Sequence, residues 1–201
     1  MTELRVLAPL GGRLWRPQSG TWQTNRSNGP GDEHGITFDH IRVIAAAMLY
    51  KDSRQGIFAV GDPADETRDA PSGACIVRDE LRKFDVDPHD IYCIEARTTH
   101  GQLSSICNVA SHFGAERIDL ISNEWHLGRI RAMIECSPHL EELRAIDWRT
   151  VAAEEVMLKH DFATWASTIR AVRGYDRTLR RIMQEQKGQM EVYGGKYHYA
   201  T

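Results

Sequence analysis

Four short apolar runs separated by helix-length segments constrain the fold of this chain more than any other feature. Each run has too little polar alternation for a strand with one solvated face and is typical of strands buried on both faces of a parallel sheet. The runs cover residues 5–10, 56–60, 91–94 and 118–121. The sequence therefore predicts a sheet of parallel strands with its helices between them.

Apolar residues recur at helical spacing in the segments between the runs. The four stripes comprise Phe38, Ile41, Ala45 and Met48; Val77, Leu81 and Phe84; Leu103, Ile106, Ala110 and Phe113; and Leu127, Ile130 and Ile134. Strand and helix alternate in this order, which calls for right-handed crossovers and helices on both faces of the sheet. We therefore expect an α/β fold, a Rossmann-like three-layer sandwich with C-terminal helices.

The C-terminal quarter follows a different pattern. Residues 143–148 (LRAIDW) indicate a weaker fifth strand, and a long helical stripe follows, made of Leu158, Phe162, Trp165, Ile169 and Val172. An arginine-rich helix is expected over residues 175–187. We expect residues 1–150 to form the α/β domain and residues 151–201 to form a helical extension packed on its sheet, at an edge or on one face.

Two segments are irregular in composition. Residues 11–35 are rich in Gly, Pro, Asn and Ser and are too long for an ordinary connection, so we expect a functional or mobile loop. The tail from residue 191 combines two glycines with three tyrosines. It either frays or folds over a pocket.

Composition excludes several classes of protein. The 201-residue chain has a formal net charge of -3 with both signs mixed along it, which argues against a nucleic-acid surface. Its four cysteines form no C-x-x-C pair and indicate reduced structural thiols. No apolar run approaches the roughly 20 residues of a membrane span, and no secretory leader is visible. We expect a cytoplasmic protein whose partner is a small-molecule ligand.

The position of a ligand site follows from the fold class. In open parallel sheets ligands bind outside the carboxyl ends of the strands, where the strand order reverses. The segments that follow the four predicted strands are polar or rich in glycine. They cover residues 11–13, 61–63, 95–99 and 122–126.

The first of these segments has a weak binding signal. Gly11 and Gly12, followed by Arg13, can bring backbone N–H groups close to an anion, although a Gly-Gly pair after a strand is equally often only a tight turn. The chain has neither a dinucleotide-binding glycine motif nor a P-loop. A nicotinamide cofactor is therefore not indicated. The histidines lack metal-ligand spacing, so a metal is not indicated either.

His126 and Arg129 carry more information. They lie one helical turn apart at the start of a helix and flank its apolar stripe. The positive end of that helix, with Arg129 as a fixed cation, suits a phosphate or carboxylate, and His126 can move a proton near neutral pH. The alternative is that His126 caps or packs the helix while Arg129 forms a surface ion pair.

Other candidates at the strand ends are more ambiguous. Glu95 is a candidate acid or base, but with Arg97 it also fits a solvated ion pair. Asp62 can orient a histidine or bind a ribose hydroxyl, or it can simply form a turn. Trp125 either stacks on a ligand ring or packs. The remaining ligand-binding candidates are Gly61, Thr99, Gln102 and Asn123.

Taken together, these motifs resemble the ElyC/SanA/YdcF family of bacterial proteins. The matching segments run in the family's order over residues 4–136: PLGG at 9–12, FAVGD at 58–62, PSGA at 71–74, EARTTHGQL at 95–103 and LISNEWHLGRI at 120–130. The resemblance implies a Rossmann-like fold with a polar pocket at the strand ends. It favours functional roles for His126 and Arg129 first, then for Gly11 and Gly12.

The chain departs from the family pattern at two glutamates. Glycine stands at 73, where the family usually has the Glu of Ser-Glu-Ala, and at 101, in place of the Glu of Asn-Thr-x-Glu-Asn. The departure implies a changed or lost reaction and a larger pocket. Glu95, Asp62, Glu124 and His100 then remain for acid–base work.

Two functions are compatible with these patterns, beside a purely structural role as a partner protein. The first is an enzyme that acts on a small anionic or nucleotide-like metabolite by hydrolysis or group transfer, with His126, Glu95 and Asp62 as the catalytic candidates. The second is a binding module that has lost catalysis along with the two glutamates. A nucleoside-type ligand such as S-adenosylmethionine is compatible with either.

Overall fold

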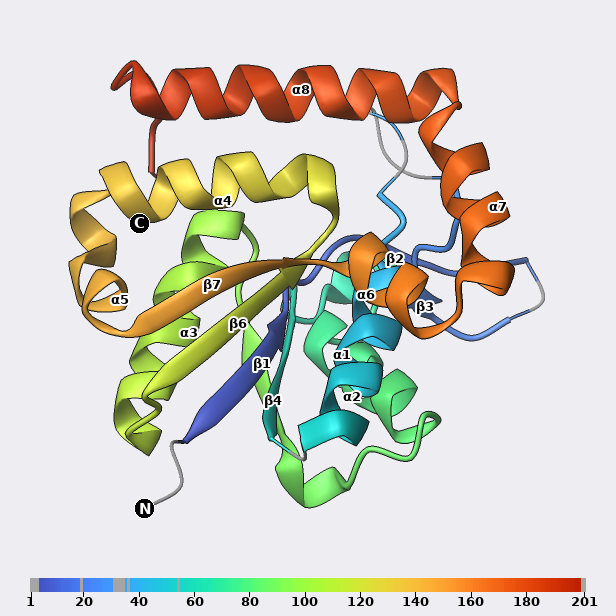
Figure 1. Ribbon diagram of the computed structural model, residues 1–201, viewed down its shortest axis with the longest axis horizontal. Coiled ribbons are helices and arrows are strands. Elements are labelled where there is room, and N and C mark those ends of the chain that lie inside the picture. The colour runs from blue at the N-terminus through green and yellow to red at the C-terminus, as the bar shows by residue number, and fades with distance from the viewer. Residues whose placement is uncertain (1–3, 19, 31–34, 36, 54, 200–201) are drawn as a thin grey trace.

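The chain folds into a Rossmann-like α/β structure around one five-stranded parallel sheet (Figure 1). The computed structural model describes residues 4–18, 20–30, 35, 37–53 and 55–199. The strand order is β5-β4-β1-β6-β7. The strands are β1 (Arg5–Pro9), β4 (Gly56–Gly61), β5 (Ile91–Glu95), β6 (Arg117–Ser122) and β7 (Asp147–Ala152). The predicted fold class is confirmed.

Helices cover both faces of the sheet, and successive strand residues point to opposite cores. In β1, Val6 packs among residues of one core and Leu7 among those of the other. This double burial explains the continuous apolar runs of β1, β4 and β6. In the edge strand β5, Tyr92 and Cys93 are exposed, so the prediction that this strand is buried on both faces is wrong. One face carries α1 (His40–Ser53), α2 (Gly73–Arg82), α6 (Ala153–His160) and α7 (Phe162–Arg173), and the other α3 (Thr99–Phe113), α4 (Glu124–Cys136) and α5 (Glu141–Ala145).

The chain winds in opposite directions from the centre of the sheet. From β1 it proceeds outward to β4 and β5, then returns across the sheet through α3 to β6 on the other side of β1. The connections after β1 and β6 therefore leave toward opposite faces, which opens a crevice between their carboxyl ends. This switch point is where the predicted site residues 11–13 and 122–126 meet.

The fifth strand is displaced from its predicted position. Residues 141–145 form α5, and β7 begins at Asp147, so the prediction of a strand at 143–148 is wrong over its first half. The apolar Leu143 packs into the core from a helix rather than a strand. The charged Arg144 interrupts the apolar run. Its guanidinium donates to the carbonyl oxygens of Ile134 and Ser137, both at 2.8 Å. β7 also crosses the expected boundary at residue 150.

The C-terminal helices differ from the predicted pair. The long stripe is divided between α6 and α7 at Asp161, whose carboxylate accepts the Thr164 N–H at 3.1 Å and caps the new helix. The last helix, α8 (Asp176–Tyr193), extends beyond residue 187 and lies along α4 rather than on the sheet (Figure 1). This placement brings one face of α8 to the end of the sheet where the site residues lie.

The predicted loop over residues 11–35 holds a small antiparallel hairpin of β2 (Leu14–Trp15) and β3 (Gln23–Thr24). Thr24 anchors the hairpin to Glu80 of α2: its N–H donates to Oε1 at 2.9 Å and its hydroxyl donates to Oε2 at 2.5 Å. Residues 19 and 31–34 of this segment lie outside the described residues. The described part is therefore tied to the body of the fold.

The tail folds back over α3. The rings of Tyr199 and His100 have centroids 4.7 Å apart, and Tyr197 packs beside them against the core. Short 3-10 turns complete the structure: η1 (Glu66–Arg68), η2 (Pro88–Asp90) and η3 (Pro138–Leu140). All four cysteines are free thiols. Within the described residues, no helix has both the length and the apolar character that crossing a bilayer requires.

Candidate functional site

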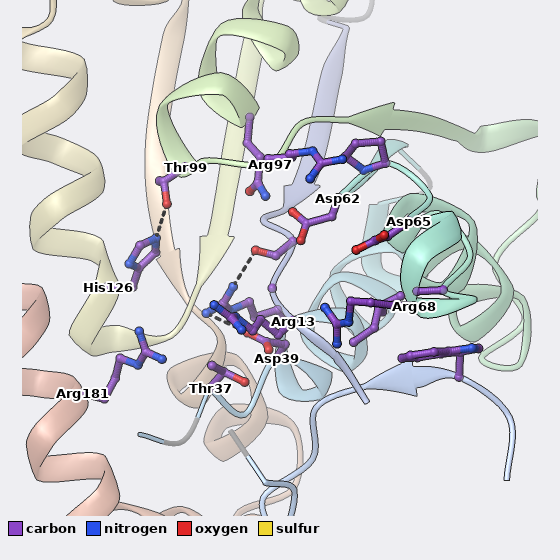
Figure 2. A pocket seen from close by; sticks show the side chains of 18 of the residues that line it. Arg13, Thr37, Asp39, Asp62, Asp65, Arg68, Arg97, Thr99, His126 and Arg181 are labelled. Atoms are coloured by element: carbon purple, nitrogen blue, oxygen red, sulfur yellow. Dashed lines mark hydrogen bonds and ion pairs between the residues drawn. The ribbon is translucent and has the colours of Figure 1, made fainter. Parts of the chain in front are cut away.

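A cavity of about 380 Å³ opens at the carboxyl ends of the strands, at the switch point between β1 and β6 (Figure 2). Its wall combines the segments after β1, β4 and β5 with the first turns of α3 and α4 and one face of α8. Charged residues dominate it: Arg13, Asp39, Arg42, Asp62, Asp65, Arg68, Arg97, His126, Arg129, Arg181 and Glu185.

Ten of the thirteen predicted site residues line the cavity. They are Gly11, Gly12, Arg13, Asp62, Arg97, Thr99, Gln102, Trp125, His126 and Arg129. Glu95, Gly61 and Asn123 do not. Glu95 ends the edge strand β5 with its side chain exposed, so it has no place in this site. Gly61 lies behind Gly11, against the start of α2.

His126 occupies the centre of the wall. It is buried in the first turn of α4, with Nδ1 2.7 Å from Glu185 Oε2 and Nε2 3.4 Å from Thr99 Oγ1. Burial lowers the pKa of His126 to about 4; the Glu185 carboxylate works in the opposite direction, whereas the Arg129 and Arg42 charges add to the lowering. The imidazole is therefore neutral at pH 7.

The tautomer of His126 follows from its partner. Burial alone would raise the pKa of Glu185, but at the acid pH where it titrates the charge and hydrogen bond of protonated His126, with the charges of Arg129 and Arg181, lower the pKa to about 2. Glu185 is then a carboxylate, which only accepts, so His126 Nδ1 carries the proton and donates it at 2.7 Å. The Arg129 Nη2, 3.3 Å from the same nitrogen, is also a donor and forms no hydrogen bond with it in this tautomer. The lone pair of Nε2 faces Thr99 and the cavity (Figure 2).

Arg129 lines the cavity and also forms an ion pair. Its Nε lies 2.8 Å from Glu185 Oε2, and its Nη2 donates to Glu185 Oε1 at 3.3 Å. Arg181 Nη1 approaches the same carboxylate at 3.6 Å. The guanidinium is therefore ion-paired, as in the alternative interpretation, but with a buried glutamate of α8 in the cavity wall rather than at the surface. A single carboxylate thus orients His126 and offsets part of the positive charge.

The loop after β1 is held from below by Arg42. This buried arginine of α1 donates through Nη1 to the carbonyl oxygens of Leu10 at 3.0 Å and Gly11 at 3.3 Å. Its Nη2 lies 3.1 Å from Asp39 Oδ1. The guanidinium therefore fixes the course of the glycine turn and brings a positive charge to the cavity floor.

Asn123 belongs to the support of the site rather than to its surface. Its Oδ1 accepts from Arg42 Nε at 2.6 Å, and its amide donates to Glu154 Oε1 at 2.9 Å. Glu154 Oε2 also accepts the Glu124 N–H at 2.9 Å. The first amide of α4 is thus bound by an internal carboxylate, so less of this helix start is open to a ligand than the sequence led us to expect.

The twin glycines are required by close packing. A Cβ at Gly11 would lie 2.6 Å from the Val60 carbonyl oxygen, and a Cβ at Gly12 would lie 2.1 Å from the Asp39 carboxyl. Both distances are far below van der Waals contact. Glycine therefore lets the turn pass between the end of β4 and the start of α1.

The outer part of the cavity carries three cationic side chains around Asp62 (Figure 2). Burial raises the pKa of Asp62, although the neighbouring charges of Arg97 and Arg13 oppose this effect. The guanidinium groups of Arg68 and Arg97 form no hydrogen bond or close ion pair with any described residue. Their guanidinium groups are therefore available to an anion that enters the cavity.

Uncharged side chains complete the wall. Trp22 and Trp125 both line the cavity, and the Trp22 indole N–H donates to the Asp69 carbonyl oxygen at 2.9 Å. Trp125 also packs against the hydrophobic core that contains residues of α1 and α6, as the packing alternative predicted. Thr37 is buried, and its hydroxyl has no hydrogen-bond partner among the described residues.

Sequence reasoning missed the residues contributed by α1 and α8. Glu185 and Arg181 lie far along the chain, in a helix noted only as rich in arginine. Arg42 left a clearer signal, because a charged residue inside an otherwise apolar helix is buried only with partners. Asp39 just before that helix gave no such signal.

Gly73 and Gly101 do not face the cavity. A Cβ at Gly73 would lie 2.9 Å from Asp62 N, and one at Gly101 would lie 3.2 Å from Thr98 Oγ1. Neither residue lines the wall, so the expected enlargement of the pocket does not arise from them. Among the described residues no group of three or more His, Cys, Asp or Glu could hold a metal ion.

Comparisons with the models of known protein families, with curated protein sequences and with solved structures found no match. The resemblance to the ElyC/SanA/YdcF family therefore stays a prediction that rests on the motifs of residues 4–136. The function has to be argued from the cavity itself.

Proposed function

We propose that this protein is an enzyme that hydrolyses a small anionic metabolite or transfers a group from it, with His126 as the general base. The observation that carries the proposal is the orientation of His126. Glu185 holds one ring nitrogen and leaves the other, unprotonated, at the cavity surface. A histidine placed between an orienting carboxylate and a cavity is the arrangement that proton abstraction requires.

The charge of the cavity supports an anionic substrate. Six arginines line it, against four carboxylates. Arg68 and Arg97 have no close partner among the described residues, and guanidinium groups bind phosphate and carboxylate through paired hydrogen bonds. Binding of an anion in this cavity is therefore favourable, because its negative charge replaces solvent around the arginines.

Substrate binding also tunes the base. The low pKa of His126 results first from burial and then in part from the positive charges of Arg129 and Arg42. An anion in the cavity offsets those charges and raises the pKa of His126 toward neutrality, where a general base is most effective. His126 then becomes a stronger base when the substrate is present.

Asp62 is suited to the opposite role. It lines the same cavity, and burial raises the pKa of its carboxyl group. Two titratable groups whose pKa values are shifted in opposite directions in one site are a common arrangement for an acid and a base. We assign Asp62 as the proton donor to the leaving group.

A planar ring on the substrate would find two partners in the cavity wall. Trp22 and Trp125 offer indole faces of the kind on which nucleobases stack. The proposal includes nucleoside-type ligands such as S-adenosylmethionine. Its only requirement is that the ligand carries an anionic group.

The test combines a binding screen with turnover. The wild type is screened by thermal shift against sugar phosphates, nucleoside phosphates and carboxylate esters, and each stabilising compound is then incubated and analysed for products. We expect His126→Asn to lower kcat about 100-fold or more on the compound that turns over. His89→Asn, at an exposed position in η2, is the matched control and should leave kcat unchanged.

Two outcomes would contradict the proposal. If the stabilising compounds are recovered unchanged, the protein is a binding module without catalysis. If His126→Asn turns over as fast as the wild type, the base lies elsewhere. A smaller check is the pKa of His126 measured by NMR, which should rise when inorganic phosphate is added.

A further inference from the structure

Thr99 stands in line with His126 and Glu185 across the wall of the cavity. Its Oγ1 lies 3.4 Å from His126 Nε2 (Figure 2). His126 Nδ1 in turn lies 2.7 Å from Glu185 Oε2. The three side chains come from the starts of α3 and α4 and from α8. A hydroxyl, an imidazole and a carboxylate in this order are the parts of a nucleophilic triad, and the hydroxyl-to-base distance is often this long without substrate.

Thr99 has little competition for this role. The described residues that line the cavity include one other hydroxyl side chain, Thr37, and no Ser, Cys or Tyr. The Thr37 hydroxyl has no hydrogen-bond partner among the described residues and so no base to activate it. Thr99 is thus the hydroxyl that the base contacts.

The local structure does not need the Thr99 hydroxyl. The preceding residue, Thr98, is the N-cap of α3, and its Oγ1 accepts the Gly101 N–H at 3.0 Å. Thr99 is the first residue inside the helix, and its only described side-chain hydrogen bond is to His126. Two adjacent threonines therefore have separate tasks: one caps the helix and the other faces the cavity.

We propose that Thr99 is the nucleophile of this site and that it accepts a phosphoryl group from a phosphomonoester. This inference rests on the proposed function and names its substrate class. Arginine forks suit the oxygens of a transferring phosphoryl group. The amino end of α3, a helix of 15 residues, adds its positive dipole beside Thr99.

The reaction balances with the groups in the cavity. The bond from Thr99 Oγ to phosphorus forms as the ester oxygen–phosphorus bond breaks. The Thr99 hydroxyl proton passes to His126 Nε2, and the leaving alkoxide takes a proton from the Asp62 carboxyl. A water molecule then attacks the phosphorus and returns a proton to Asp62, while the proton on His126 returns to Thr99 Oγ. Inorganic phosphate and an alcohol are the products.

The experiment uses the full chain and p-nitrophenyl phosphate, with sugar phosphates and nucleoside monophosphates alongside. Samples quenched in acid during turnover are analysed by intact mass and peptide mapping. We expect one added phosphoryl group on residue 99 of the wild type. Thr99→Val should lower kcat about 100-fold or more and carry no adduct, whereas Thr99→Ser should keep activity within about tenfold and carry the adduct on the new hydroxyl.

A matched control separates chemistry from folding. Thr164→Val makes the same change at an exposed position of α7 and should leave kcat unchanged. Thr99→Val should unfold at the wild-type urea concentration, because its hydroxyl caps nothing. A Thr99→Val variant with wild-type kcat, while His126→Asn is inactive, would overturn this inference and leave the proposed function standing with water as nucleophile. A wild type that turns over only esters of other acids would likewise overturn the phosphoryl assignment alone.

Discussion

Two clusters in this protein contain the same three residue types in different arrangements. In the cavity, Thr99, His126 and Glu185 form a series in which the two ring nitrogens contact different partners. Behind the β2–β3 hairpin, Thr24 and Glu80 both contact the same nitrogen of His40, at 3.0 and 3.1 Å. The second cluster is closed on itself, because Thr24 also donates to Glu80.

The arrangement of the hydrogen bonds suits one cluster to the catalysis that we propose and the other to anchoring the hairpin. A closed cluster satisfies its own donors and acceptors and presents nothing to a ligand, so its contribution is to hold the hairpin on α2. A serial cluster leaves its last member at a surface, and here that surface is the cavity. Residue type alone therefore does not distinguish the two clusters, whereas the order of their hydrogen bonds does.

The largest expected effect compares the two glutamates. Glu185→Gln should lower kcat by roughly 100-fold to 10,000-fold, because an amide no longer demands a proton on His126 Nδ1 and the tautomer with a free Nε2 loses its advantage. Glu80→Gln should leave kcat of the folded protein near the wild-type value and instead lower stability. Turnover of the identified substrate and urea unfolding measure the two effects. Equal losses of kcat in Glu185→Gln and Glu80→Gln would contradict the proposed difference between the two clusters.

The next effect is the pH dependence of stability. His126 has its pKa lowered to about 4 in the folded protein, so acidification from pH 6.5 protonates the unfolded chain first. The free energy of unfolding should therefore fall by about 3 kcal/mol between pH 6.5 and 4 through this residue. Glu185, with its pKa lowered to about 2, adds a further loss as pH falls below 4.5.

The matched variant for this titration is His126→Gln, which should lack the part of the slope between pH 6.5 and 4. In the closed cluster, burial alone would raise the pKa of Glu80, but hydrogen bonds with His40 and Thr24 outweigh it and lower the pKa. Its contribution is therefore lost only below pH 4.5. Urea unfolding at a series of pH values distinguishes the windows, and identical slopes for wild type and variant would refute the burial of a neutral His126.

A smaller effect distinguishes the two threonines. Thr24→Val should cost about 1–2 kcal/mol of unfolding free energy, because it removes a buried hydrogen bond to Glu80 and leaves an acceptor with one partner fewer. Thr99→Val should change stability by less than about 0.5 kcal/mol. Chemical denaturation of both variants under one set of conditions gives the comparison, and a larger loss in Thr99→Val would assign Thr99 a structural task.

The smallest effect is local. Glu80→Gln should raise the rate of amide hydrogen exchange in the β2–β3 hairpin, since the side chain that anchors Thr24 is weakened. Exchange around the first turn of α4 should stay as in the wild type. Faster exchange spread over the whole sheet would show instead that the closed cluster stabilises the entire fold rather than the hairpin.

Single residues of the site show which contacts could be predicted from the sequence and which could not. His126 and Arg129 are three residues apart, and local helical geometry alone brings them to one side of a helix start that follows a strand. Glu185 lies 59 residues from His126 and meets it only because α8 runs along α4. Local periodicity predicts that such a helix exists, but not the neighbour it packs against.

A similar limit applies to the residues that the sequence selected and the structure moved aside. Glu95 ends β5 and Asn123 follows β6, both at the carboxyl edge of the sheet. Glu95 turns to solvent because β5 lies at the edge of the sheet, and Asn123 is engaged beneath the cavity by Arg42 and Glu154. Position in the chain places a residue near a strand end, whereas the direction of its side chain depends on contacts with distant segments.

The alternation of buried strands and striped helices was sufficient by itself to predict the parallel sheet and the edge at which the cavity opens, because burial and periodicity act over neighbouring residues. The tertiary structure alone decided that a glutamate from the last helix orients His126, that Thr99 meets its other nitrogen, and that arginines from six segments share one cavity. Those contacts join residues far apart in the chain, and their formation depends on how whole elements pack together.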